Sequence, residues 1–233
     1  MRALSAALLL TLLVSPAAAA PTDAADHDAF FLWAGVKSQP HLARARTLYL
    51  LQGQVENGEP VRLVAQRQAV PRIAHADVWM AVRVETLAWP DEVYDQVLAA
   101  LARWRAAGSH VVGLQIDFDA GTRHLERYAS FLADLRKRLP QEYRLSITGL
   151  LDWSSNGDPA GLAALGGVVD EVVLQIYQGR RVIPGYAGYL VSLDRLRIPF
   201  RIGLLQGGDW EAPAQLARNP FFRGYVVFLV NEK

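Results

Sequence analysis

Short apolar segments of strand length recur along the chain, and each is rich in β-branched and aromatic residues. Segments of this length and composition, bounded by polar or glycine-containing stretches, are typical of buried β-strands. The sequence therefore predicts eight strands. They fall at residues 30–36, 47–55, 77–85, 111–119, 144–150, 171–177, 200–205 and 224–230.

Helical periodicity separates several of these strands. Residues 90–108 begin with Pro-Asp-Glu, end at a glycine, and carry apolar residues on one helical face. Residues 122–140 show the same spacing and stop before Pro140. The spacing predicts a helix over each of these two segments. Shorter helices are expected at residues 158–167, around 188–197, and at 212–222.

The alternation of strands and helices predicts an α/β protein with parallel strands and right-handed crossovers. Eight strands favour a closed (β/α)8 barrel of the TIM type. Residues 54–63 contain Asn57-Gly58, a hairpin signal, where a crossover helix would be expected, so a β-hairpin insertion is predicted early in the barrel. No closing helix is expected after the eighth strand. A doubly wound open sheet is the alternative architecture.

The first twenty residues have a composition unlike the rest. A short basic start precedes an apolar run at residues 3–14 and a stretch rich in small residues at 15–20. This layout is typical of a cleavable secretory signal, and the apolar run is short for a membrane-spanning helix. We therefore expect a signal peptide at residues 1–20 and one barrel domain at 21–233. The mature protein is expected to be periplasmic or secreted, without stable membrane insertion after cleavage.

The amino-acid composition argues against several classes of function. The chain has 24 basic and 23 acidic residues, and it lacks a basic block of the kind that binds nucleic acid. Cysteine is absent, so an exported domain has to depend on its hydrophobic core. The five histidines show no metal-ligand spacing, and no dinucleotide fingerprint or nucleophile-elbow serine is present. No metal, cofactor or nucleic-acid partner is expected.

Two carboxylates follow the fourth predicted strand. Asp117 and Asp119 are two residues apart, so both point to one face, which Gln115 shares. In a barrel this position is the C-terminal rim, where active sites form. Neighbouring carboxylates raise each other's proton affinity, as a general acid requires. A structural alternative is that the two aspartates pair with Arg83 or cap the helix beginning near Thr122.

Other predicted strands end in polar and aromatic residues that would converge on the same rim. The flat apolar faces of tryptophan and tyrosine suit the C–H faces of sugar rings. Glu85 could equally balance Arg83, Asp152 could be an ordinary loop charge, and Arg180 and Arg181 could belong to a solvated loop. The candidate substrate-binding residues are Gln115, Glu85, Asp152, Trp153, Gln175, Tyr177, Trp33 and Trp210.

These motifs resemble two families. VGLQIDFD (112–119) resembles the Asp-Gly-x-Asp-x-Asp-x-Glu signature of chitinase-type family 18 glycoside hydrolases, with Gly113 and Asp117 retained and Asp119 in the place of the catalytic Glu. LQIY (174–177) resembles the family's sixth-strand motif, and Phe228 falls near its floor tryptophan. This resemblance implies attack by the substrate's own N-acetyl group, steadied by Asp117. An aspartate in place of the glutamate moves the acid back by roughly 1.5 Å, a shift that can lower a catalytic rate.

Most of residues 111–211 resemble a bacterial domain-of-unknown-function family, numbered 3142, which looks like a divergent branch of the same barrel group. Two functions of different classes follow. The first is an exported glycoside hydrolase with a polysaccharide or oligosaccharide substrate, Asp119 as the general acid and Asp117 as its orienting partner. The second is a non-catalytic barrel that binds a glycan or a partner in the cell envelope.

Overall fold

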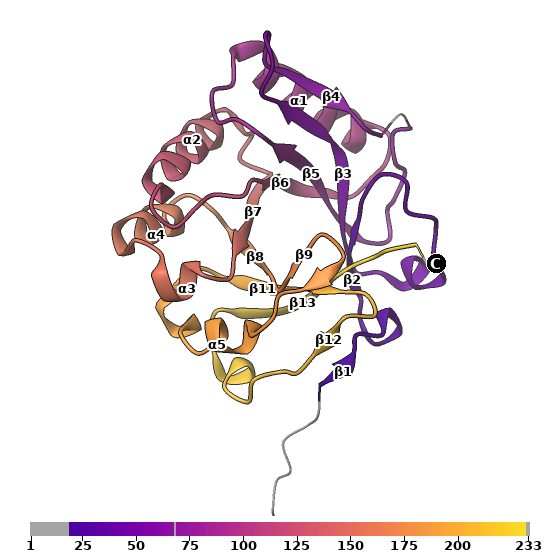
Figure 1. Ribbon diagram of the computed structural model, residues 1–233. Coiled ribbons are helices and arrows are strands. Elements are labelled where there is room, and N and C mark those ends of the chain that lie inside the picture. Colours follow the sequence, from indigo (N-terminus) through magenta and orange to yellow (C-terminus); the bar gives the residue numbers. More distant parts are fainter. Residues whose placement is uncertain (1–18, 68, 232–233) are drawn as a thin grey trace, which may run out of the picture.

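The computed structural model describes residues 19–67 and 69–231. Eight parallel strands form a closed ring, because β2 pairs with β13 on one side and with β3 on the other (Figure 1). The predicted (β/α)8 barrel is therefore confirmed, and the open-sheet alternative is wrong. In chain order the strands are β2 (Ala29–Leu32), β3 (Thr47–Glu56), β5 (Asp77–Val84), β6 (Val111–Asp117), β7 (Arg144–Leu150), β8 (Glu171–Gln175), β11 (Phe200–Leu205) and β13 (Phe222–Phe228).

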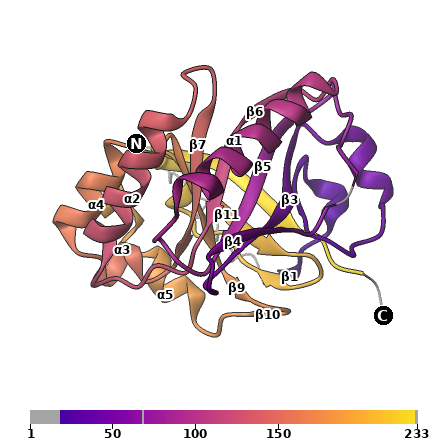
Figure 2. The same cartoon turned by 90° about the horizontal axis from the view of Figure 1, so that it is seen from above.

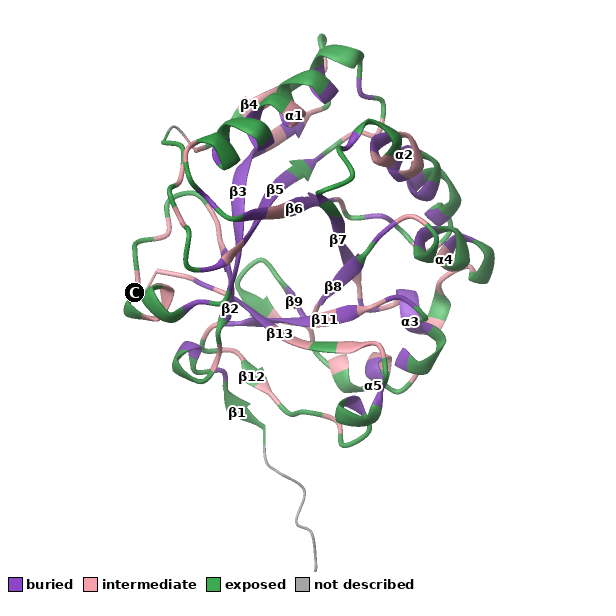
Figure 3. Ribbon diagram, turned by 180° about the vertical axis from the view of Figure 1, so that it is seen from behind, coloured by how far each residue is buried: buried purple, intermediate pink, exposed green. Residues whose placement is uncertain are grey.

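Most barrel strands are buried on both faces, which explains the nearly continuous apolar runs, whereas β13 is partly exposed. In β5, Met80 and Val82 pack outward against the surrounding helices, whereas Trp79 points into the barrel with Phe31 and Tyr49. Figure 3 shows this ring of buried strands inside a partly exposed outer layer. Two apolar layers thus hold the barrel, one inside the ring and one between the ring and its helices.

The helices cover the outside of the ring (Figures 1 and 3). The two predicted long helices are present as α1 (Asp91–Ala106) and α2 (Leu125–Arg138), and the shorter one as α4 (Pro159–Gly166). The short helix α3 (Trp153–Asn156) precedes α4. The predicted helix around 188–197 is divided into α5 (Tyr186–Leu190) and a 3-10 turn, η3 (Leu193–Arg195).

The helix predicted at residues 212–222 is not formed. Only a 3-10 turn, η4 (Leu216–Arg218), appears in this segment. Pro213 and Pro220 bracket the segment, and proline restricts the residue before it and removes a backbone donor. The segment instead forms a loop, in which the apolar residue Leu216 is buried.

The predicted hairpin insertion replaces the second crossover helix. β3 extends beyond the ring and pairs in antiparallel fashion with β4 (Arg62–Ala65), from Gly53 opposite Ala65 to Glu56 opposite Arg62. Asn57-Gly58 lies in the connecting turn, as the sequence predicted. β4 lies beside α1, so the hairpin covers part of the barrel where a helix would otherwise pack.

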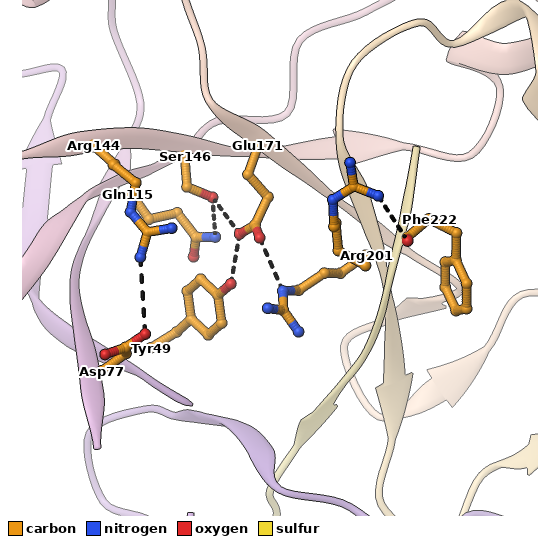
Figure 4. Close-up of polar contacts among 9 residues, drawn as sticks. Tyr49, Asp77, Gln115, Arg144, Ser146, Glu171, Arg201 and Phe222 are labelled. Carbon is orange, nitrogen blue, oxygen red and sulfur yellow. Dashed lines mark hydrogen bonds and ion pairs between the residues drawn. The ribbon is translucent and has the colours of Figure 1, made fainter. Parts of the chain in front are cut away.

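Polar side chains fill part of the barrel interior (Figure 4). Glu171 Oε1 accepts hydrogen bonds from the Tyr49 hydroxyl at 2.5 Å and from Ser146 at 3.3 Å, and Glu171 Oε2 accepts one from Arg201 Nε at 2.9 Å. Gln115 Nε2 donates to Ser146 at 3.0 Å. These contacts join β3, β6, β7, β8 and β11 across the ring, so they connect strands that are not all neighbours.

Two short antiparallel pairs lie outside the ring. β1 (Ala20–Pro21) pairs with β12 (Asp209–Trp210), and β9 (Tyr177–Gln178) pairs with β10 (Arg181–Val182). The β9–β10 hairpin is drawn in front of the ring in Figure 1 and extends from one end of the barrel in Figure 2.

The predicted signal peptide falls almost entirely on residues 1–18, which lie outside the described part of the chain. Within the described ranges, 19–67 and 69–231, no helix is long and apolar enough to cross a membrane.

Candidate functional site

A pocket of about 630 Å³ opens at the C-terminal ends of the barrel strands. Residues from the ends of β5, β6, β7 and β8 and from the loops that follow β2, β6, β7 and β8 meet there. Six residues predicted from the sequence contribute to its wall: Trp33, Asp117, Asp119, Asp152, Gln175 and Tyr177. The rim position inferred from the strand order therefore corresponds to an actual cavity.

Asp117 is the last residue of β6 and is only 8 % exposed. Its Oδ1 accepts a hydrogen bond from the Thr148 hydroxyl at 2.8 Å. Burial raises the pKa of Asp117, and the charge of Asp119 adds to this rise, while the Thr148 hydrogen bond and the charge of Arg83 oppose it. Because Oδ1 is occupied by Thr148, Oδ2 is the oxygen on which a proton is best accommodated.

Asp119 lies two residues beyond Asp117, on the same side of the chain, and is exposed to the pocket. Both aspartates also line a smaller adjoining cavity of about 280 Å³ together with Arg83 and Glu85. Arg83 is the register neighbour of Asp117 on β5. Asp119 is therefore free to meet a ligand, while Asp117 is fixed behind it.

The structure gives little support to the alternative in which Asp117 and Asp119 pair with Arg83 or cap the helix that begins near Thr122. Among the described residues, neither carboxylate forms an ion pair. Helix α2 begins at Leu125 with His124 at its N-cap, and no side chain caps it. The two carboxylates are thus neither helix caps nor members of a salt bridge within that part of the chain.

An aromatic wall faces the carboxylates. The Trp33 ring meets the Phe228 ring edge-on at 5.6 Å, and the Tyr177 ring lies 5.2 Å from Phe228. The Tyr177 hydroxyl is buried and has no hydrogen-bond partner among the described residues. Burial raises the pKa of Tyr177 and the negative charge of Asp117 raises it further, while the nearby Gln175 side chain opposes the rise, so the phenol stays protonated. A donor without a partner at a pocket wall is suited to an oxygen of a ligand.

Asp152 and Gln175 complete the polar part of the pocket wall. Gln175 ends β8, and Asp152 stands at the N-cap of α3 without capping it through its side chain. One oxygen of Asp152, Oδ1, is buried and without a partner among the described residues. The sequence favoured an ordinary loop charge over a catalytic role for Asp152, and the structure places this residue in the pocket wall.

Two of the predicted binding residues lie just outside this pocket. Gln115 is fully buried beneath it and donates to Ser146, so it belongs to the interior network of Figure 4. Glu85 accepts hydrogen bonds from Gln54 Nε2 at 2.6 Å and from the Asn57 backbone N–H at 3.0 Å. Glu85 therefore holds the β3–β4 hairpin and reaches only the smaller adjoining cavity.

Two of the predicted tryptophans are not available to the pocket. Trp153 is 0 % exposed, and its indole N–H donates to the Ala120 carbonyl at 2.9 Å. Trp210 lies on β12 and stacks against Tyr186 at 5.4 Å, away from the pocket wall. The prediction that Trp153 offers a ring face to sugar is corrected, because this ring is fully buried. Trp210 is half-buried and does not line this pocket.

Thr148 and Tyr189 are pocket-region residues that the sequence interpretation did not single out. Thr148 lies on the inward face of β7, two residues after Ser146. The alternation of side chains along this strand could therefore have identified Thr148 from the sequence. Tyr189 comes from α5 and reaches the pocket only through the path of the loop after β8. Among the described residues, no three His, Cys, Asp or Glu side chains gather as metal ligands.

The fold and the site together define a class, which is a closed (β/α)8 barrel with a carboxylate-lined pocket at the C-terminal ends of its strands. Residues 76–185 match the model of a family described as a domain of unknown function (DUF3142), so the predicted family resemblance is confirmed over this part of the chain. No curated protein matches the sequence.

Several solved structures share the fold. The spore cortex-lytic enzyme SleL of Bacillus cereus is 15 % identical with a TM-score of 0.53, and the match covers 76 % of this chain and 49 % of SleL. The chitinase domain of the Clostridium difficile spore coat protein CotE is 10 % identical with a TM-score of 0.53, covering 75 % of this chain and 63 % of that domain. This chain therefore spans about half of SleL and under two thirds of the CotE domain.

A third similar structure is not described as an enzyme. The xylanase and alpha-amylase inhibitor protein XAIP-II from Scadoxus multiflorus is 12 % identical with a TM-score of 0.53, and the match covers 86 % of this chain and 92 % of XAIP-II. At these identities the likeness to all three structures concerns the fold alone. The residues of the pocket have to be argued from their own chemistry.

Proposed function

We propose that this protein is an exported glycoside hydrolase that cleaves a polysaccharide, with residues 1–20 as its secretory signal and residues 21–233 as one barrel domain. One observation carries the proposal. Asp117, Asp119 and the unpartnered hydroxyl of Tyr177 line a single pocket of about 630 Å³ at the C-terminal rim of a chitinase-type barrel. The mature protein acts in the periplasm or outside the cell.

Asp119 is the proposed general acid. It is exposed at the pocket, so its carboxyl group can reach the oxygen that joins two sugars. In the reaction Asp119 gives its proton to that oxygen, the bond from the oxygen to the anomeric carbon breaks, and one sugar leaves as an alcohol. Water finally supplies the hydroxyl group of the new reducing end and returns a proton to Asp119.

Asp117 is the proposed orienting partner. Its raised pKa favours a proton on the carboxyl group, and its Thr148 contact occupies Oδ1. A protonated Oδ2 can donate a hydrogen bond to Asp119 or to the acetamido group of a substrate. The chitinase-type resemblance gives this residue the second role, in which it steadies the attacking N-acetyl oxygen.

The aromatic wall is the proposed sugar-binding surface. Trp33 and Phe228 present apolar ring faces and edges, and Tyr177 adds a hydroxyl that has no hydrogen-bond acceptor among the described residues. Gln175 and Asp152 supply further polar groups at the same wall. An apolar surface with a few convergent polar groups is the ordinary composition of a small-ligand site.

A non-catalytic glycan-binding barrel is the second candidate, and two observations favour it. Asp119 is one methylene shorter than the glutamate of the resembling motif, and the similar XAIP-II is an inhibitor protein. The same aromatic wall would then bind the glycan or an envelope partner without cleaving it.

A substrate panel separates the two candidates. The purified protein is incubated with chitin, peptidoglycan, β-glucan and partly deacetylated poly-N-acetylglucosamine, and new reducing ends and bound protein are both measured. The hydrolase proposal expects reducing ends from one polymer. Binding without any release, lost in Trp33→Ala, would instead support the binding module, and neither binding nor release would contradict both candidates.

A further inference from the structure

A second pocket of about 570 Å³ adjoins the first on the other side of the β9–β10 hairpin. Its polar lining consists of Gln178, Arg180, Arg181, Gln206 and Asn231, and no carboxylate of the described part of the chain is among the residues that line it. The first pocket, in contrast, is lined by three aspartates and two arginines. The two pockets therefore differ in the sign of the charge that they accept.

The β9–β10 hairpin contributes wall residues to both pockets. Gln178 and Arg180 line both cavities. Between them Gly179 has a φ of +58°, so the chain turns tightly and brings Arg180 back over the rim. A chain of sugars that leaves the first pocket past Arg180 enters the second one directly.

Arg180 is held in place on this path. Its Nη2 donates to the Asn231 carbonyl at 3.0 Å, and the Asn231 side chain is bonded in turn to the Gly35 carbonyl at 2.9 Å and to the Lys37 backbone N–H at 2.8 Å. One contact uses one of the five donors of a guanidinium group. The remaining donors of Arg180 can bind a ligand without first having to be ordered.

The opposite wall of the second pocket is fixed as well. Gln206 Oε1 accepts a hydrogen bond from the Val230 backbone N–H at 2.9 Å, and the Gln206 amide pairs reciprocally with Gln39 at 2.9 and 3.2 Å. Arg181 is exposed and forms no ion pair with a described residue. Two cationic side chains thus face a rigid amide-lined wall, and no carboxylate of the described residues 19–67 and 69–231 forms an ion pair with them.

We propose that this second pocket is a subsite for an acidic sugar, whose carboxylate is bound by Arg180 and Arg181. The proposal rests on the proposed hydrolase function, because it places this sugar next to the one in the first pocket. A guanidinium group matches a carboxylate with two parallel hydrogen bonds, which a neutral sugar does not offer. The aspartates of the first pocket disfavour a second anion there. The preferred polymer therefore has a neutral sugar beside an acidic one.

Binding of matched oligosaccharides tests the subsite. Isothermal titration calorimetry on the full mature chain compares a chitin tetrasaccharide, which is neutral, with a hyaluronan tetrasaccharide and a peptidoglycan glycan-strand tetrasaccharide. The last two carry a uronic carboxylate and a lactyl ether carboxylate, so they distinguish the two sources of acidic sugar. At least one acidic tetrasaccharide is expected to bind tenfold or more tightly than chitin, and this preference should fall as salt is raised.

Charge variants assign the preference to the pocket. Arg181→Glu is expected to weaken binding of the acidic tetrasaccharide about tenfold and to leave chitin binding within about twofold, because Arg181 lines only the second pocket. The double variant Arg180→Gln/Arg181→Gln is expected to weaken binding of the acidic tetrasaccharide at least as much. Arg127→Gln, at an exposed position on α2, is the matched control and should change neither. Unchanged melting temperatures establish that the variants are folded.

The outcomes separate this inference from the proposed function. Equal binding of acidic and neutral tetrasaccharides, or a preference that survives Arg181→Glu, would overturn the subsite even if chitin is cleaved. An arginine-dependent preference without cleavage of any polymer would keep the subsite and contradict the hydrolase. Absence of binding to all three tetrasaccharides would contradict both.

Discussion

Asp117 illustrates how one residue can combine a structural cost with a chemical use. Its carboxyl group is 8 % exposed at the end of an apolar strand, and burial raises its pKa. A buried ionised carboxylate costs free energy, so the fold is more stable when this group carries a proton. The same property makes Asp117 a better hydrogen-bond donor in the pocket than an ordinary surface aspartate, because its raised pKa lets it keep a proton to a higher pH.

The cost should be visible in the pH dependence of stability. Because the pKa of Asp117 is raised in the folded state, its contribution to the free energy of unfolding is fully present below the unfolded-state pKa, and it is lost as the pH rises through the folded-state pKa. Asp117→Asn keeps an acceptor for Thr148 and removes the ionisation. We expect this variant to gain stability relative to the wild type as the pH is raised towards neutrality.

Urea denaturation from about pH 3.5 to pH 7 measures this effect. Asp95→Asn, at an exposed position on α1, is the control for loss of a surface carboxylate. A stability difference between wild type and Asp117→Asn that stays constant over this range would contradict the account of Asp117.

Two tryptophans that look alike in the sequence should behave in opposite ways. Trp153 is fully buried, so Trp153→Ala should lower the free energy of unfolding by about 4 kcal/mol. Trp33 is half-buried in the pocket wall, so Trp33→Ala should weaken glycan binding about tenfold while costing much less stability. Chemical denaturation and binding on the same two variants check this assignment, and a stability loss in Trp33→Ala as large as that in Trp153→Ala would contradict it.

At the scale of the elements, β6 shows why a glycine stands inside a barrel strand. A Cβ atom at Gly113 would meet the Arg144 carbonyl on the neighbouring strand and the ring of Trp79. The Trp79 ring is itself sandwiched, since Tyr49 stacks on it at 5.8 Å and the Arg144 guanidinium lies 4.9 Å from its centre. Neither the backbone nor the ring has room to withdraw.

Gly113→Ala is therefore expected to destabilise the protein by about 2–3 kcal/mol through overpacking. Gly121→Ala is the matched control, because nothing lies within 4 Å of a Cβ atom there. Denaturant midpoints of the two variants give the comparison, and equal midpoints would show that β6 tolerates a side chain at Gly113.

The strands were predictable from sequence because each is a nearly continuous apolar run, and α1 and α2 because their buried faces repeat at helical spacing. The segment at residues 212–222 was misjudged, since helical spacing of apolar residues does not reveal that two prolines interrupt hydrogen bonding. Strand alternation placed Asp117 correctly. It could not show that Trp153 turns into the core, because that direction depends on the path of a loop.

At the scale of the whole molecule, closure of the ring is supported by a polar contact set inside it. Glu171 is 8 % exposed and receives hydrogen bonds from Tyr49, Ser146 and Arg201, which come from three other strands (Figure 4). These three hydrogen bonds stabilise the negative charge of the buried Glu171 carboxylate. Loss of Arg201, its one ion-pair partner in the described part of the chain, would leave that charge uncompensated.

Arg201→Met should therefore lower the free energy of unfolding by about 3–4 kcal/mol. Glu171→Gln in the Arg201→Met background should recover part of this loss, because the charge that lacked a partner is then removed. A double-mutant cycle by chemical denaturation measures the coupling between the two residues. Strictly additive effects would show that the Glu171–Arg201 contact does not contribute to closing the barrel.

The central claim is that the barrel presents Asp119 as a proton donor to a bound glycan. The most direct measurement is the initial rate of reducing-end release by the wild type and by Asp119→Asn, on the polymer that the wild type cleaves and at equal amounts of bound protein. The account predicts a loss of about 10²–10⁴-fold in Asp119→Asn with binding unchanged. A variant that cleaves as fast as the wild type would contradict the claim, and loss of cleavage in Asp117→Asn alone would assign the acid to Asp117 instead.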